Sequence, residues 1–154
     1  IINSRLEKTS FTDVEFCNCN FSNTTFDNCS FIRCEFNNCK LTGCNFIENV
    51  LFDIGFIDSN MGYANISMSN LRGIFFNNTS IRSGSLQENK VKNINFKEAD
   101  LTGTQFFKTS LNGIDLSNSN IDQIAVSLED IRGAKINQMQ AIDLMYLLGV
   151  KVVE

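Results

Sequence analysis

Residues 19–46 read CNFSNTTFDNCSFIRCEFNNCKLTGCNF, and a large apolar residue recurs at every fifth position. Extending this spacing in both directions gives 27 consecutive apolar centres, from Leu6 to Ile136, all of them Phe, Leu, Ile, Met or Val. In a chain that is 43% hydrophobic, such agreement would arise by chance with a frequency on the order of 10⁻¹⁰. An internal five-residue repeat therefore explains the pattern better than any local propensity does.

A five-residue period fits neither the period of an α-helix nor that of a flat strand. The backbone must therefore turn once per repeat, so that each centre returns to a common axis. Residues two positions before the centres fall into columns at a spacing of 20, one bulky (Ile54, Ile74, Ile94) and one small (Ser59, Thr79). This segregation predicts a four-sided coil in which residues 20 apart stack about 4.8 Å from one another, as neighbouring strands do.

The repeat resembles that of the pentapeptide-repeat proteins. Ala64-Asn65-Ile66 and Ala99-Asp100-Leu101 carry the pattern of a small residue, an amide or acid, and an apolar centre. The resemblance covers about residues 4–138 and implies an all-β fold, a right-handed quadrilateral β-helix. At about 20 residues per turn the frame predicts about 6–7 coils.

The end of the five-residue frame at Ile136 predicts one β-helical domain at residues 1–136 and a C-terminal element at residues 137–154. No linker, Pro or charge block divides the 154 residues. The net charge of −4 argues weakly against nucleic acid as a partner, and no apolar run is long enough to predict a membrane partner. The chain lacks a recognisable signal peptide and begins with Ile1 instead of Met, so we expect its native start to lie further upstream.

Most cysteines occupy the small inward position of the repeat, namely Cys19, Cys29, Cys34, Cys39 and Cys44. We expect them to be buried as small apolar residues. They are spread over four sides and the chain has no His, which argues against a metal site. A disulfide between Cys19 and Cys39, which share a column, is geometrically conceivable. Cys17 follows a centre and is expected to point outward and react readily. We therefore expect a cytoplasmic protein.

No catalytic constellation is visible in the sequence. There is no His to act as a general base at neutral pH. The glycines that precede a centre by three residues indicate turns rather than a phosphate-binding loop; they are Gly43, Gly73, Gly103, Gly113 and Gly133. We predict a protein that is not an enzyme and that has no cofactor, metal or small-molecule substrate.

Outward positions carry charges in bands along the chain. An acidic cluster near the C-terminal end of the coil is a predicted partner-binding patch, made of Asp115, Asp122, Glu129 and Asp130. A basic band in the middle contains Arg72, Lys90 and Lys92. A simple solvated surface explains these bands about as well. Four outward residues are apolar, either as a contact surface or because a bulge or kink hides them; they are Ile47, Val50, Phe52 and Ile57.

The sequence after Ile136 predicts a short helix. Asn137 followed by Gln140 matches a capping box, residues 138–148 are good helix formers, and Gly149 is a stop signal. The helix would be apolar nearly all round, so one face is expected to close the coil and the other to pack against a second copy. The predicted dimer interface comprises Met139, Ile142, Met145, Tyr146, Leu148 and Val150.

The tail from Gly133 to Val152 is similar to the closing segment of the Qnr-type quinolone-resistance proteins, and residues 62–66, GYANI, are similar to one of their internal repeats. The resemblance implies a rod-shaped homodimer that binds DNA gyrase and topoisomerase IV as a mimic of duplex DNA. No insertion interrupts the frame, so projecting loops are not expected. The predicted function is protection of the topoisomerase from quinolones or gyrase-directed toxins. The alternative is a self-associating β-helical scaffold that binds an unrelated protein.

Overall fold

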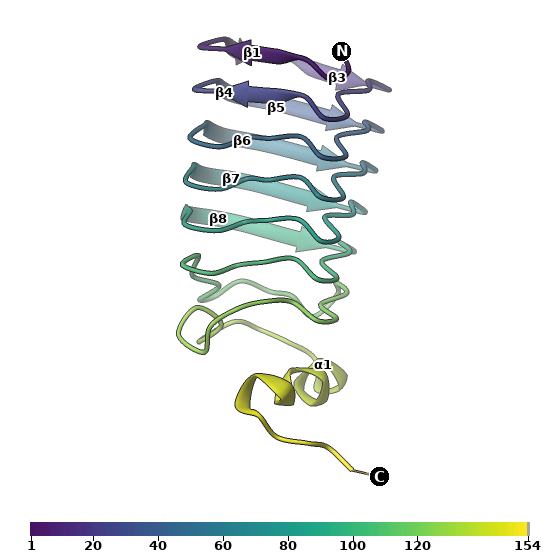
Figure 1. Ribbon diagram of the computed structural model, residues 1–154, viewed down its shortest axis with the longest axis vertical. Helices are drawn as coiled ribbons and strands as arrows, with labels where there is room; N and C mark the ends of the chain where they lie inside the picture. The colour runs from purple at the N-terminus through teal and green to yellow at the C-terminus, as the bar shows by residue number, and fades with distance from the viewer. Residues whose placement is uncertain (154) are drawn as a thin grey trace.

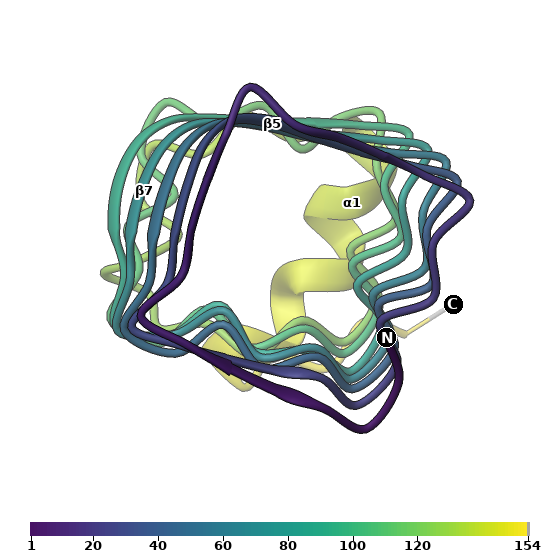
Figure 2. The same ribbon diagram turned by 90° about the horizontal axis from the view of Figure 1, so that it is seen from above.

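The computed structural model describes residues 1–153 as a rod of stacked four-sided turns, with a helical segment beyond its C-terminal turn (Figures 1 and 2). This confirms the predicted four-sided β-helix. The structure has about five turns, where the five-residue frame predicted about 6–7. The strands are β1 (Arg5–Glu7), β2 (Ser10–Thr12), β3 (Glu15–Cys17), β4 (Thr25–Asp27), β5 (Ser30–Asn37), β6 (Val50–Ile57), β7 (Asn70–Asn77) and β8 (Lys90–Lys97).

The long strands form two adjacent sides of the rod, which meet at a corner in the middle of each strand. They belong to a parallel sheet of order β2-β5-β6-β7-β8, with β3 also paired to β5. The register is 20 residues throughout; Ile54, for example, lies opposite Ile74. We call the side formed by the first half of each long strand side 1 and that formed by the second half side 2. The next two sides along the chain are sides 3 and 4.

Corners are made by residues in the left-handed backbone region, three positions before the centres. Gly43 and Gly73 have φ of 68° and 67°, and Asn38, at an equivalent corner, has φ of 52°. A Cβ added to Gly43 would lie 2.3 Å from Oδ1 of Asn23 in the turn before it. The backbone conformation and this close approach both favour glycine, which confirms that the repeated glycines are turn residues.

The centres form continuous stacks along the axis. The rings of Phe56 and Phe76 are 5.1 Å apart and nearly parallel, and Phe36 and Phe96 extend the stack with the same spacing. Small polar residues in the inward position hydrogen-bond to the turn before them. The Oγ of Ser59, for example, accepts the backbone N–H of Cys39 at 3.0 Å. The core is therefore apolar along its axis, and the small polar side chains nearer its corners have hydrogen-bond partners.

The cysteines lie where the repeat predicts. Cys29, Cys34, Cys39 and Cys44 are buried and Cys19 is half-buried, and all six thiols are free, with no disulfide between Cys19 and Cys39. The Sγ of Cys44 donates to the carbonyl of Phe21 at 2.9 Å, and burial raises the pKa of this thiol to about 12. The five inward thiols pack as small core groups, and Cys44 is a poor nucleophile because its thiolate is disfavoured.

Cys17 is exposed as predicted, but its surroundings disfavour the thiolate. Its Sγ donates to the Glu15 carboxylate at 3.1 Å, and this hydrogen bond raises the pKa of Cys17 above its ordinary value. The expectation of ready reactivity is therefore not supported. Replacing Glu15 by Gln should lower the pKa and speed alkylation of Cys17 several-fold at pH 8, because only the thiolate reacts. Iodoacetamide labelling followed by mass spectrometry measures this rate, with Cys17→Ser as background. An unchanged rate would show that Glu15 does not control the thiol.

The coil loses its regular form at residues 127–133. Ser127 and Asp130 hydrogen-bond reciprocally, at 2.6 and 3.0 Å, and Asp130 also accepts the backbone N–H of Lys108 at 2.9 Å. Leu128 is 52% exposed. Glu129 lies two residues before Ile131, where the five-residue frame predicts an inward side chain, but it is exposed. The register of the coil nevertheless continues to Ile136, because the N–H of Leu111 donates to the carbonyl of Asp130 and Asp115 pairs with Lys135. Only the inward position of Glu129 departs from the frame, because a charged side chain favours exposure to solvent.

A second irregularity separates β8 from the turn that follows it on sides 1 and 2. Within residues 1–153, no backbone hydrogen bond joins residues 90–97 to residues 110–117. A Cβ added to Gly113 would meet nothing within 4 Å. Val91 and Ile94, which face the axis, are only half-buried. On the other two sides the pairing continues through bridges such as Asp100 with Asn120. We call the unpaired boundary the seam.

The C-terminal helical segment consists of α1 (Gln138–Asp143) and a 3₁₀ turn, η1 (Leu144–Leu148), ended by Gly149 with φ of 70°. The predicted capping box between Asn137 and Gln140 is present. Gln140 is buried, and its Nε2 donates to the carbonyls of Leu116 and Ser119 at 2.8 and 2.7 Å. The helix therefore closes the last turn partly through a polar side chain. No helix within residues 1–153 is long and apolar enough to cross a membrane.

Candidate protein-binding surfaces

Side 2 and its two corners gather carboxylates from turns that are far apart in sequence. They are Asp13, Glu15, Glu35, Asp53, Asp58, Glu98 and Asp115. The basic residues on side 2 and at its corners are Arg33, Lys97 and Lys135. The seven carboxylates therefore exceed the basic residues by four. Arg33 pairs with Asp13 at 2.5 Å and lowers the pKa of that carboxyl. We call this surface the acidic side.

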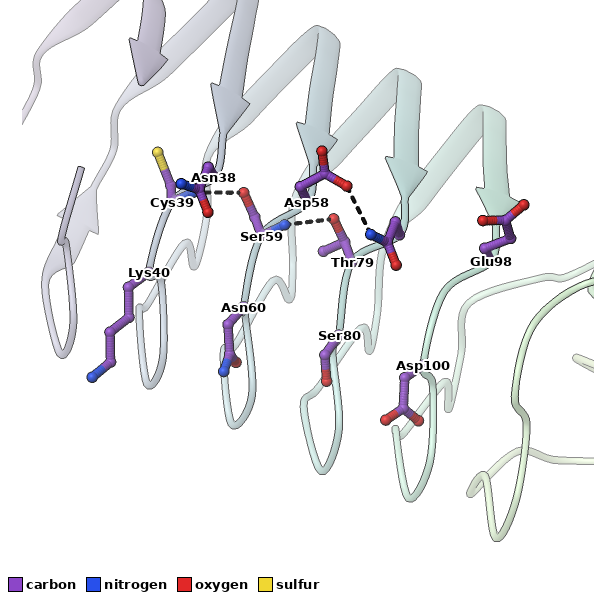
Figure 3. A pocket seen from close by; sticks show the side chains of 11 residues that line it. Asn38, Cys39, Lys40, Asp58, Ser59, Asn60, Thr79, Ser80, Glu98 and Asp100 are labelled. Carbon is purple, nitrogen blue, oxygen red and sulfur yellow. Dashed lines mark hydrogen bonds between the residues drawn. The ribbon is translucent and has the colours of Figure 1, made fainter. Parts of the chain in front are cut away.

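Two shallow grooves run along the acidic side. The first, of about 530 Å³, is lined by Asp13, Glu15, Glu35 and Asp53, together with Arg33. The second, of about 390 Å³, follows the corner between sides 2 and 3 and crosses four turns (Figure 3). Asp58 and Glu98 lie at its rim, and the Oδ1 of Asp58 accepts the amide of Asn78 at 2.8 Å. Both grooves are polar and open along the rod.

The predicted acidic patch does not form one surface. Asp115 lies on side 2, where Ser117 lowers the pKa of its carboxyl through hydrogen bonds from its hydroxyl and backbone N–H. Asp122 is exposed on side 3. Glu129 and Asp130 belong to the irregular turn, in which Asp130 is half-buried and hydrogen-bonded. Only Asp115 therefore joins the larger acidic side, and the other three carboxylates surround the C-terminal end of the rod.

The outward apolar residues are likewise divided between sides. Val50 and Phe52 lie together on side 1, opposite Asn70 and Arg72 of the next layer. Ile47 lies on side 4 and Ile57 on side 2, and both are half-buried. No bulge hides them, because β5, β6 and β7 keep a continuous register.

The helical segment exposes one apolar face. Met139 is 69% exposed and Leu148 is 59% exposed, and Ile142, Tyr146 and Val150 are also exposed. Met145 is half-buried. It contributes with Leu148 to an apolar hollow of about 240 Å³ whose other lining residues include Leu128, Ile131, Leu144 and Leu147. The hydroxyl of Tyr146 donates to the carbonyl of Ile124, so this ring is held against the last regular turn.

A model of the pentapeptide repeat region matches residues 9–86 and 29–106. The chain belongs to the pentapeptide repeat family. This agrees with the five-residue frame, the four-sided turns and the left-handed corners. A search of curated protein sequences gives no match.

Several solved structures are similar to this chain. QnrB1, a plasmid-mediated fluoroquinolone resistance protein, is 17% identical and matches with a TM-score of 0.49 over 96% of this chain and 99% of that chain. HetL, a protein involved in heterocyst differentiation regulation in the cyanobacterium Nostoc, is 14% identical, with a TM-score of 0.34 over 88% of this chain and 84% of its own. Rfr23 of Cyanothece is 12% identical, with a TM-score of 0.36 over 86% and 91%.

Proposed function

We propose that this protein is a non-enzymatic binding protein whose acidic side contacts the DNA-binding surface of a type II topoisomerase, DNA gyrase or topoisomerase IV. By occupying that surface it protects the enzyme from quinolones or gyrase-directed toxins. The similarity of the tail to the closing segment of Qnr-type proteins supports this choice of partner. The six free thiols suit a cytoplasmic protein.

The spacing of the carboxylates on the acidic side carries the proposal. Asp13 and Asp115 are about five turns apart, roughly 24 Å at the spacing of parallel strands. Seven carboxylates over this length are separated on average by about 4 Å along the axis, close to the 3.4 Å axial spacing of phosphates along one DNA strand. Three cations reduce the net charge, so the mimicry is local and one-sided. A basic protein surface that accommodates DNA would match it in charge.

The exposed apolar face of the helical segment supports a homodimer joined through the C-terminal ends. A two-fold contact would cover Met139, Ile142 and Leu148 with the same residues of the partner copy. It would also place two copies of Asp122 and Glu129 around the junction, and the acidic sides of both rods would lie on one elongated particle.

A supercoiling assay with purified DNA gyrase and ciprofloxacin tests the proposed function. We expect supercoiling to persist at drug concentrations that otherwise abolish it, in proportion to the added protein. A protein heated until unfolded serves as control. Inhibition of gyrase without the drug would support binding but contradict protection, and an absence of both effects would contradict the proposed partner.

The dimer is tested by introducing charge into the exposed helix face. Met139→Glu with Leu148→Glu should convert the dimer to a folded monomer, because two buried pairs of carboxylates would face one another without partners. Light scattering gives the mass and circular dichroism reports the retained β-structure. Lys151→Glu beside the same face is a matched exposed control. A wild-type protein that is monomeric at micromolar concentration would contradict the interface.

A second candidate function is a self-associating scaffold with an unrelated protein partner. The same apolar face favours it, since that face requires a second copy but no topoisomerase. An intact dimer that has no affinity for gyrase or topoisomerase IV would favour this candidate.

A further inference from the structure

The middle of side 1 carries positive charge that the chain does not neutralise. Within residues 1–153, the basic residues in ion pairs are Arg5, Arg33, Arg82 and Lys108. Arg72, Lys90 and Lys92 are all exposed and have no such partner. Arg72 lies directly opposite Lys92 in the ladder, about 4.8 Å away at the backbone. Like charges in this arrangement repel one another.

Apolar side chains adjoin these cations on the same side. Ile32 lies opposite Phe52, and Phe52 lies opposite Arg72. The guanidinium of Arg72 is 4.7 Å from the centre of the Phe52 ring, and Val50 is 46% exposed. We call the six residues the cationic-apolar face; they are Ile32, Val50, Phe52, Arg72, Lys90 and Lys92.

The seam adds unpaired donors beside the lysines. In the preceding turns, the corresponding N–H groups of side 1 donate to the turn that follows; that of Asp13, for example, donates to the carbonyl of Ile32 at 3.0 Å. The N–H groups of Val91 and Asn93 in β8 have no acceptor within residues 1–153. The open space at Gly113 is an independent sign that the next turn stands away from them. Unpaired N–H groups next to ammonium groups favour a negatively charged acceptor.

We propose that the cationic-apolar face is a docking surface for an acidic, apolar-bearing segment of a partner protein. Carboxylates of that segment contact Lys90, Lys92 and the N–H groups at the seam, while its apolar side chains cover Phe52 and its neighbours. A second copy does not fit, because identical faces would bring like charges together. Duplex DNA fits poorly, because half of the face is apolar and the net charge of the chain is −4. The partner surface is opposite in charge to the one proposed for the acidic side.

Binding of a short fluorescein-labelled peptide with alternating Glu and Leu, measured by fluorescence anisotropy, tests this proposal. The variant with Arg72→Glu, Lys90→Glu and Lys92→Glu should bind the peptide at least about tenfold more weakly than the wild type. The matched control with Lys8→Glu, Lys40→Glu and Lys151→Glu should bind like the wild type, since these exposed lysines lie elsewhere. Circular dichroism establishes that both variants are folded.

Two further measurements separate the alternatives. A peptide with Ser in place of Leu should bind several-fold more weakly, and hydrogen exchange at Val91 and Asn93 should slow when the Leu peptide binds. Absence of peptide binding, equal loss in both triple variants, or exchange at the seam that does not change would overturn the proposal. Tighter binding of duplex DNA than of the peptide at this face would assign it to nucleic acid instead. Loss of self-association in the variant with Arg72→Glu, Lys90→Glu and Lys92→Glu would assign it to a second copy.

Discussion

Replacing Phe56 by Ala is expected to lower the free energy of unfolding by about 3–5 kcal/mol, the usual cost of removing a buried Phe from a core that cannot collapse around the gap. Phe56 is 0% exposed and lies between Phe36 and Phe76, each at 5.1 Å. The backbone ladder holds the neighbouring turns at a fixed spacing, so relaxation into the cavity is limited. Urea denaturation followed by circular dichroism measures the change.

Phe107→Ala is the matched control, since Phe107 is 42% exposed and points outward. Its replacement should cost less than about 1 kcal/mol. Similar costs at the two positions would contradict the division between inward and outward positions on which the description of every surface depends.

The second large effect concerns the acidic side. A variant with Glu35→Gln, Asp53→Asn and Asp58→Asn should bind gyrase about 10–30-fold more weakly at low salt, because three charges that face a basic surface are removed together. The size and backbone preference of each side chain are retained; Asn suits the left-handed corners of Asp53 and Asp58, whose φ values are 54° and 48°. Fluorescence anisotropy with labelled protein measures the affinity.

A second variant places the same number of changes outside the acidic side. Glu48→Gln, Asp122→Asn and Glu129→Gln should leave the affinity within about twofold of the wild type, apart from a small nonspecific charge effect. If this variant loses affinity while the first does not, the contact lies at the C-terminal end of the rod, as the sequence alone suggested.

The periodicity was sufficient to predict the core and the shape of each turn. Phe36, Phe56 and Phe76 stack because residues 20 apart must occupy equivalent places in a four-sided coil. The positions of the corner glycines and the inward cysteines follow from the same frame. These predictions succeeded because each depends on short-range geometry repeated many times.

The surfaces are harder to predict, because outward residues that share a side of the rod are 20 positions apart in the sequence. Asp13, Asp53 and Glu98 are distant in sequence but lie on one side of the rod or at its corners. Outward residues compared at a spacing of 20 indicate which carboxylates share a side. Glu129 in an inward position is the local sequence signal for the irregular turn. The seam has no comparable signal, since Val91, Ile94 and Leu111 all fit the frame.

Competition with DNA tests the central claim most directly. Gyrase is first bound to a fluorescent duplex, and the unlabelled protein is then added at low and at raised salt. If the acidic side occupies the DNA-binding surface, the wild-type protein displaces the duplex, and its potency falls steeply as salt rises. The variant with Glu35→Gln, Asp53→Asn and Asp58→Asn then fails to displace the duplex. A duplex that stays bound at saturating protein, or equal displacement by wild type and variant, would contradict the claim that this side occupies the DNA-binding surface.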